Sequence, residues 1–109
     1  MASSFKNFTA QAVGITANAV YNPTTANIQS TVIGMTLSNI ITSTVSVSVF
    51  LYDGSANTYL IKNAVVPVGG TLVPIGGDQK LVLEQNNSIY VTSNTASSVD
   101  VIISALEIT

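Results

Sequence analysis

The sequence predicts an all-β fold, a single-domain antiparallel β-sandwich or jelly-roll-like barrel of about seven to eight short strands. Turn signals recur roughly every 8 to 12 residues, the spacing typical of such folds. Between the turns, apolar and polar residues alternate, as in strands with one face in water, and Val, Ile and Thr are frequent. No segment keeps the apolar period of a helix across several turns, so we expect no helical layer.

The first segment, residues 1–13, is expected to form a first strand or an ordered arm of this domain, which spans residues 1–109. In an extended chain Phe8 falls on one side of the segment and Phe5 on the other. Chain termini are often frayed, but two Phe residues so early favour docking. The surface they dock on is either the domain itself or a neighbouring molecule.

Residues 28–39 follow a loop marked by the Asn-Pro dipeptide at residues 22–23, and they alternate as a strand does. We expect the core face of this strand to carry three apolar side chains, Ile33, Met35 and Leu37.

The clearest strand covers residues 44–52, where four apolar residues line one face and small polar residues the other. The apolar residues are Val45, Val47, Val49 and Leu51. Asp53-Gly54-Ser55 then supplies a tight turn, and residues 59–66 return as the hairpin partner.

The final strand, residues 99–108, is apolar on both faces. A strand with one wet face would alternate more strictly, so we expect this one to be covered twice, the second time by a neighbouring molecule. Asp100 either faces solvent or meets a Lys of another subunit, because a buried carboxylate needs a partner. The expected subunit interface combines the outer face of this strand with the two amino-terminal Phe residues, namely Phe5, Phe8, Asp100, Ile102, Ser104, Leu106 and Ile108.

Charged residues make up only 7% of the chain, against a usual share of about 25%, whereas hydrophobic residues make up 47%. With three Lys, no Arg and no His, the chain offers no basic stripe to nucleic acid. No apolar run approaches the roughly 20 residues of a membrane span, so we expect no membrane partner. So little charge gives little repulsion between copies, which suits a subunit held in an assembly.

No catalytic or cofactor-binding motif occurs in the sequence. The lack of His and Cys removes the usual base of a Ser or Cys nucleophile and the usual zinc ligands, so we expect no enzyme, no metal and no cofactor. A calcium site at Asp53 or Asp78 is the best metal alternative, but both residues stand beside Gly in turns, where Asp serves the backbone. A stacking platform for sugars is a further alternative, to be built from Tyr21, Tyr52, Tyr59 and Tyr90.

Four segments of the second half carry a resemblance to a known family; they are Ile61–Gly69, Lys80–Glu84, Ile89–Ser93 and Ser98–Ile108. They resemble the carboxyl-terminal half of small virion proteins of tailed bacteriophages, including phages of marine cyanobacteria. The resemblance covers about half of the chain and contributes no catalytic residues. It implies a component of a phage particle, located in the virion and assembled in the host cytoplasm.

Within a virion we favour a capsid decoration or cement protein, a homo-oligomer, with a trimer favoured, that binds the major capsid protein and stabilises the head shell. The alternatives are a tail, neck or baseplate accessory subunit and, in a different class, a carbohydrate-binding adhesion module.

Overall fold

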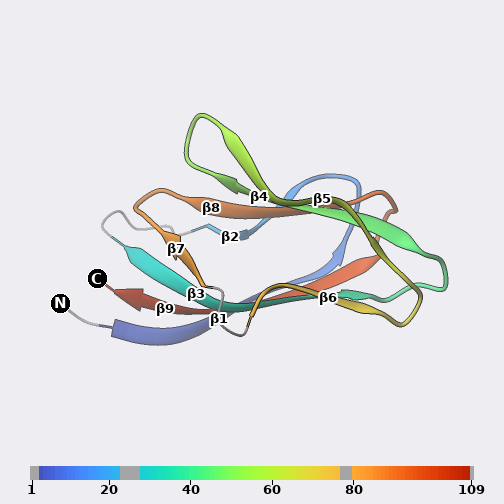
Figure 1. Ribbon diagram of the computed structural model, residues 1–109, viewed down its shortest axis with the longest axis horizontal. Helices are drawn as coiled ribbons and strands as arrows, with labels where there is room; N and C mark the ends of the chain where they lie inside the picture. Colours follow the sequence, from blue (N-terminus) through green and yellow to red (C-terminus); the bar gives the residue numbers. More distant parts are fainter. Residues whose placement is uncertain (1–2, 23–27, 77–79, 109) are drawn as a thin grey trace.

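The computed structural model describes residues 3–22, 28–76 and 80–108, and among them it contains strands and turns but no helix. Nine strands form two antiparallel sheets that pack face to face (Figure 1). The predicted all-β sandwich is confirmed, with nine strands instead of the seven or eight expected. The strands are β1 (Ser3–Val13), β2 (Asn18–Tyr21), β3 (Gln29–Asn39), β4 (Val45–Tyr52), β5 (Asn57–Val66), β6 (Thr71–Ile75), β7 (Leu81–Leu83), β8 (Ser88–Ser93) and β9 (Val99–Ile108).

The strand order is that of a jelly roll. Sheet A has the order β1-β9-β3-β6, with the short β7 also pairing with β3, and sheet B has the order β2-β8-β4-β5. The first strand therefore pairs with the last, β2 with β8, β3 with β6, and β4 with β5. This nested pairing is what results when one long antiparallel hairpin rolls up into two sheets.

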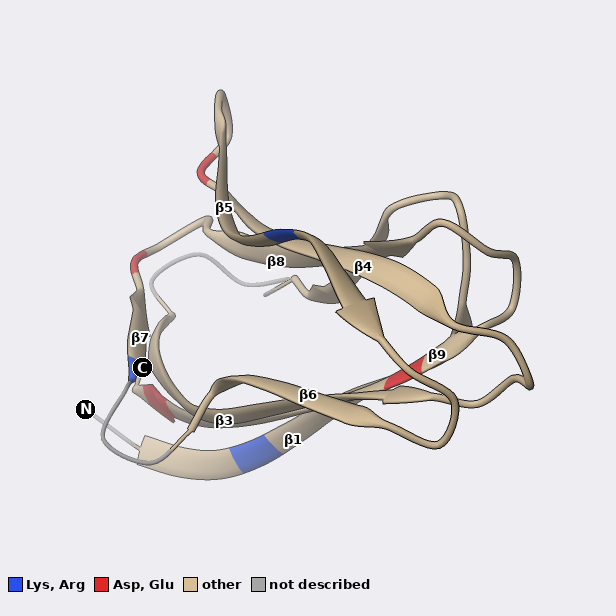
Figure 2. Cartoon of the chain, turned by 45° about the vertical axis from the view of Figure 1, so that its right-hand side comes forward, with Lys and Arg blue, Asp and Glu red and all other residues tan. Residues whose placement is uncertain are grey.

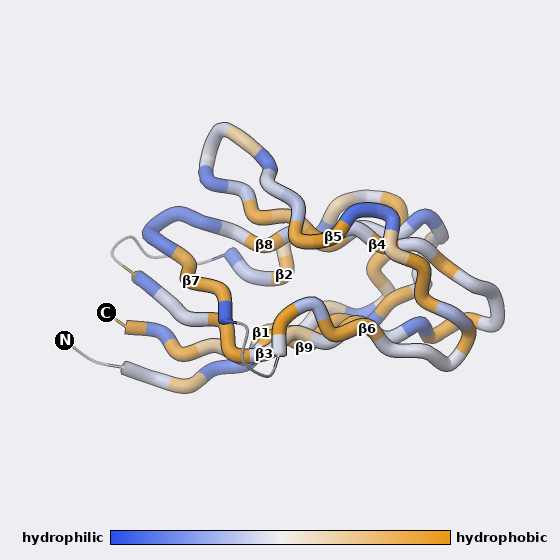
Figure 3. Tube along the Cα trace, viewed as in Figure 1, coloured by the Kyte–Doolittle hydropathy of each residue, from blue (hydrophilic) through white to orange (hydrophobic). Residues whose placement is uncertain are grey.

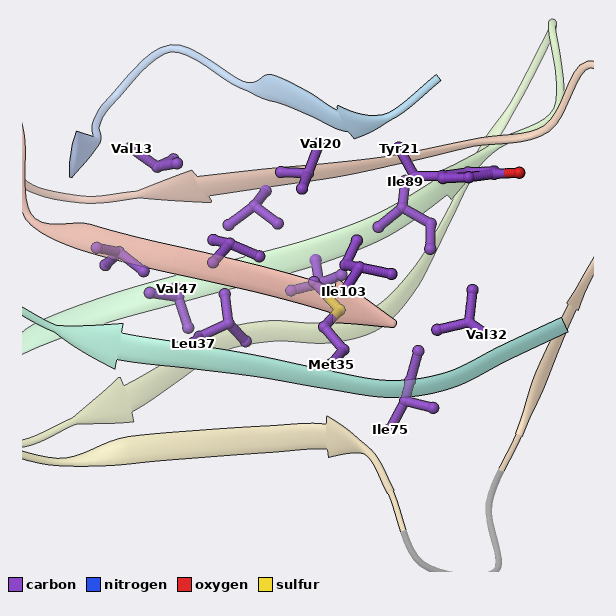
Figure 4. Close-up of a cluster of buried hydrophobic side chains, with 14 of the residues drawn as sticks. Val13, Val20, Tyr21, Val32, Met35, Leu37, Val47, Ile75, Ile89 and Ile103 are labelled. Carbon is purple, nitrogen blue, oxygen red and sulfur yellow. The ribbon is translucent and has the colours of Figure 1, made fainter. Parts of the chain in front are cut away.

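The core lies between the two sheets and follows the alternation of the strands. Side chains of β4 and β8 on one side meet side chains of β3 and β9 on the other, and Figure 4 shows Val47, Leu37, Met35 and Ile103 pointing into this space. All four are at most 1% exposed. The expected core face of residues 44–52 is thus present, because period-2 alternation places every second side chain inward.

Ile33 departs from the expected core face of β3 and is partly exposed, whereas Met35 and Leu37 are buried as expected. The register of β3 against β9 shifts between Val32 and Gly34, so that Ile33 is an extra residue in a β-bulge. Before the bulge Val32 faces inward, and after it Met35 does. The expectation for Ile33 was wrong because one inserted residue reverses the alternation.

β1 is an edge strand of sheet A and runs along the full length of β9, from Ser3 opposite Ile108 to Val13 opposite Val99. Near its end the register shifts again, and Ala12 adopts a positive φ of 53°. There the chain leaves sheet A and continues into β2 of sheet B (Figure 1).

In the part of the chain that the structure describes, no helix is long and apolar enough to cross a membrane.

Candidate interaction surfaces

β9 lies in the middle of sheet A, between β1 and β3, and separates its side chains into two sets. Those at odd positions, from Val99 to Glu107, are buried between the sheets. Those at even positions face outward, and of these Ile102 is 52% exposed while the others are partly buried. The outward set contains the five expected interface residues of this strand, Asp100, Ile102, Ser104, Leu106 and Ile108.

Phe5 of β1 joins this outer face. It stands opposite Leu106 in the β1–β9 ladder and is 77% exposed. Residues that are directly opposite in an antiparallel pair share a face, so Phe5 extends the apolar row of β9 to the edge of the sheet.

Phe8 lies on the other side of β1, away from this face. It packs against the buried core, and its ring meets the Tyr21 ring edge-on at a centroid distance of 4.5 Å. Of the two docking sites weighed for the amino-terminal Phe residues, Phe8 therefore docks on its own domain, and the structure separates it from the other expected interface residues.

Asp100 has an intramolecular partner. Its Oδ1 accepts a hydrogen bond of 2.9 Å from the backbone N of Ala12, the bulged residue of β1. The carboxylate therefore stabilises the point where β1 leaves sheet A. This contact is a third alternative to the two environments expected for Asp100, plain solvent or a Lys of another subunit.

Three apolar side chains that the interface prediction did not include extend the same face. Ile33 reaches it through the bulge of β3. Val82 of β7 lies opposite Thr31 of β3, which faces outward. The alternation of β6 directs Val73 outward. A shallow hollow of about 330 Å³ opens among Phe5, Lys6, Asn7, Ile33, Ser104 and Ala105. The one sequence signal for the outward position of Ile33 was Gly34, since an isolated Gly in a strand often marks a bulge.

We call the outer side of sheet A, with Phe5, Ile33, Val73, Val82, Ile102 and Leu106, the apolar face. Hydrophobic residues recur along β3, β7 and β9 in Figure 3, and Figure 2 shows how few charges the two sheets carry. Among the described strand residues of the apolar face, Asp100 is the one charged side chain. Contiguous exposed apolar surface on a small protein is typical of an interaction site.

Two further charges of sheet A, the buried Glu107 and the half-exposed Lys6, form an ion pair. Glu107 is 5% exposed, and its Oε1 lies 3.1 Å from the Nζ of Lys6. Its Oε2 accepts a hydrogen bond of 2.8 Å from the hydroxyl of Tyr21. Burial, and then the nearby carboxylate, raise the pKa of Tyr21 from 10.0 to about 12.

The four Tyr residues considered for a sugar platform divide between the core and one surface. Tyr21 is fully buried, whereas Tyr52, Tyr59 and Tyr90 gather with Phe50 on the outer side of sheet B. The sequence could not separate Tyr21 from the other three, because β2 is too short to show a pattern.

The calcium alternative finds no cluster of ligands in the described residues. No group of three Asp, Glu, His or Cys side chains comes together there. The Oδ1 of Asp53 accepts backbone hydrogen bonds from Ser55 and Ala56, and the bonds from Ala56 and then Ser55 lower the pKa of Asp53. This is the turn role expected from its sequence, and Asp78 lies outside the described residues.

Comparison with known proteins gives structural neighbours but no sequence relative. No protein-family model matches the chain, and no curated protein matches its sequence. A protein of the Bacillus endospore appendages, which form disulfide-linked pili, is similar in fold, with a TM-score of 0.57 and 16% identity over 99% of this chain and 87% of the other. At that identity the likeness shows the fold alone.

Two viral proteins are more distant in structure. A pentameric capsid protein from metagenomic phage sequences has a TM-score of 0.38 and 15% identity, over 94% of this chain and 59% of the other. VP2 of infectious bursal disease virus, in a subviral particle, has a TM-score of 0.42 and 9% identity, over 94% of this chain and 36% of the other. Scores this low establish no common fold.

Proposed function

We propose that this chain is a non-enzymatic structural subunit of a bacteriophage virion, and specifically a capsid decoration protein. In this proposal it binds the head shell as a homo-oligomer, a trimer placed around local symmetry axes. The observation that carries this proposal is the apolar face. It carries several exposed apolar side chains, is nearly free of charge, and lies on a sheet whose opposite side already forms the core.

The occupant proposed for the apolar face is protein. Burying exposed apolar area yields about 25 cal/mol per Å² before the costs of association, and Phe5, Ile102 and Val82 offer such area side by side with small polar residues. Ser, Thr and Asn side chains between them can fix the register of a partner through hydrogen bonds. Copies of this chain and neighbouring capsid subunits are partners of that kind.

The jelly-roll fold is compatible with this role. One solved structure of similar fold is described as part of the pili of endospore appendages, which are assemblies of subunits. The resemblance of residues 61–69, 80–84, 89–93 and 98–108 to small phage virion proteins is the reason for placing the assembly on a phage particle.

Substitution of Leu106 by Asp tests the interface. The charge would stand in the middle of the apolar face, where a partner would have to bury it, so Leu106→Asp is expected to give a folded monomer that neither oligomerises nor binds capsids. The matched control is Val65→Asp, because Val65 is 66% exposed on the outer side of sheet B. Sedimentation velocity and co-sedimentation with undecorated capsids are the measurements. Normal assembly of Leu106→Asp would exclude the apolar face as the interface.

The copy number on purified particles separates the decoration role from the tail, neck or baseplate alternative. Decoration predicts on the order of hundreds of copies, whereas a tail or neck component predicts about six or twelve, following the symmetry of those structures. Removing the protein from particles is expected to lower the temperature of shell rupture. A rupture temperature that stays unchanged would contradict a stabilising role.

A further inference from the structure

The outer side of sheet B carries an aromatic row that the assembly role does not use. Tyr90 of β8, Phe50 of β4 and Tyr59 of β5 lie directly opposite one another in neighbouring strands, and Tyr52 of β4 stands next to them. This surface is on the opposite side of the sandwich from the apolar face (Figure 1).

The rings of the aromatic row hold one another in place. Phe50 and Tyr90 stack in parallel planes with their centroids 5.2 Å apart, and Tyr59 leans on Phe50 at 5.3 Å. Tyr52 stands nearly perpendicular to Tyr90, at an interplanar angle of 85°, and its hydroxyl donates a hydrogen bond to the backbone O of Gly54. A ligand that used these rings would find them already oriented, so that little side-chain entropy would be lost on binding.

A hollow of about 250 Å³ opens beside the row, lined by Ala17, Phe50, Tyr52, Asn57 and Tyr90. Its volume is below the roughly 300 to 1,000 Å³ of pockets for drug-sized molecules, so it suits a ligand of one or two rings. The lining combines aromatic surface with an amide side chain and two phenol groups, and it contains no charged residue. The nearby Lys62 is already placed over the Tyr59 ring, with its Nζ 4.9 Å from the ring centroid.

We propose that this hollow binds a neutral pyranose ring, and that the protein therefore carries a carbohydrate site on sheet B. A pyranose has one face of C–H groups and an edge of hydroxyl groups. The C–H face can stack on the Tyr90 ring, to which the Tyr52 ring stands nearly perpendicular, and the hydroxyl edge can hydrogen-bond with Asn57. An anionic ligand would lack a free cation in the lining, and a cationic one would lack a carboxylate.

This inference does not rest on the assembly role. A copy attached through the apolar face would present sheet B to the solvent, so the two surfaces are compatible in one particle. A copy that never assembles would keep the hollow all the same.

The test is saturation-transfer-difference NMR of the purified chain with three probes, the methyl β-pyranosides of glucose, galactose and N-acetylglucosamine. At least one probe is expected to receive saturation, mainly on the C–H protons of one ring face. Tyr90→Leu is expected to weaken binding about tenfold, the loss of one ring contact. Tyr90→Phe keeps the ring and loses one hydroxyl, so it is expected to bind within about threefold of the original.

Ile102→Ser on the apolar face is the matched control and is expected to bind the probe unchanged. Circular dichroism checks the fold of each variant, and Tyr90→Phe together with Asn57→Ala provides the comparison if Tyr90→Leu does not fold. Lack of saturation transfer to all three pyranosides at about 10 mM, a concentration above the dissociation constants of weak sites, would overturn the proposal. Transfer that is equally strong in Tyr90→Leu or Asn57→Ala would also overturn it. Binding by an assembly-defective Leu106→Asp chain would show that the two proposals stand or fall separately.

Discussion

Glu107 is a buried carboxylate in a chain with very few charges, and the Lys side chain that pairs with it is much more exposed. The side chain of Lys6 is 54% exposed, whereas that of Glu107 is 6% exposed. Replacing Lys6 by Met would leave the buried carboxylate without its ion pair, at an expected cost of about 2 to 4 kcal/mol of unfolding free energy. The double variant Lys6→Met/Glu107→Gln removes the stranded charge and is expected to regain much of that loss. Urea unfolding at neutral pH measures both, and a double variant less stable than Lys6→Met would contradict this account.

Tyr21 makes stability depend on alkaline pH. Its pKa is about 12 in the folded chain, against 10.0 for an ordinary Tyr. Below about pH 10 the hydroxyl is protonated in both states and its stabilising contribution is fully present; between about pH 10 and 12 the unfolded chain loses the proton more readily, so that contribution is lost. The stability difference between the original chain and Tyr21→Phe is therefore expected to be constant up to about pH 10 and to shrink above it. Urea titrations across this range measure the difference, and a difference that stayed constant above pH 10 would contradict this role of Tyr21.

At the scale of the element, the bulge in β1 depends on Asp100. The carboxylate holds the amide of Ala12, whose positive φ is uncommon for a residue other than Gly. Asp100→Ala is expected to lose about 1 to 2 kcal/mol and to speed amide exchange in the last residues of β1, whereas Asp100→Asn keeps an acceptor and is expected to lose less. Hydrogen exchange of the two variants distinguishes this role from a contact with another subunit. Equal exchange rates in the original chain and both variants would show that Asp100 does not stabilise the bulge.

The strands with regular alternation could be predicted from the sequence, and the interruptions could not. In β4 and β9 the alternate apolar residues from Val45 to Val49 and from Val99 to Ala105 are buried, as their pattern predicts. Ile33 was placed wrongly, and Tyr21 was not distinguished from the other Tyr residues, for different reasons. A bulge shifted Ile33 by one position, whereas Tyr21 lies in the core, where its hydroxyl donates a hydrogen bond to a distant residue, Glu107. Gly34 is the one neighbouring signal for the bulge, and no residue next to Tyr21 signals its contact with Glu107.

At the scale of the whole molecule, the pairing of the first strand with the last depends on contacts across nearly the entire chain. Local patterns predict how many strands form and which faces are apolar, but not which strand lies beside which. For that reason the final strand and Phe5 were expected on an outer interface, while β3 and its bulge, which complete the apolar face, could not be assigned to it. Val73 and Val82 could not be assigned to the apolar face either, since their short strands carry too few residues to show a pattern.

Assembly through the apolar face is expected to be nearly insensitive to salt. Electrostatic contacts between exposed charges weaken as the Debye length falls from about 10 Å at 0.1 M to about 3 Å at 1 M salt. The described strand residues of the apolar face contain one charged side chain, Asp100, and that carboxylate is engaged with Ala12. The dissociation constant of the oligomer is therefore expected to change less than about threefold across this range, or to fall slightly as salt strengthens apolar contacts. Sedimentation equilibrium at both salt concentrations measures it, with Leu106→Asp as the variant that stays monomeric. A tenfold weaker affinity between the copies at high salt would mean that charged groups elsewhere on the molecule hold them together. That result would contradict the assignment of the apolar face as the interface.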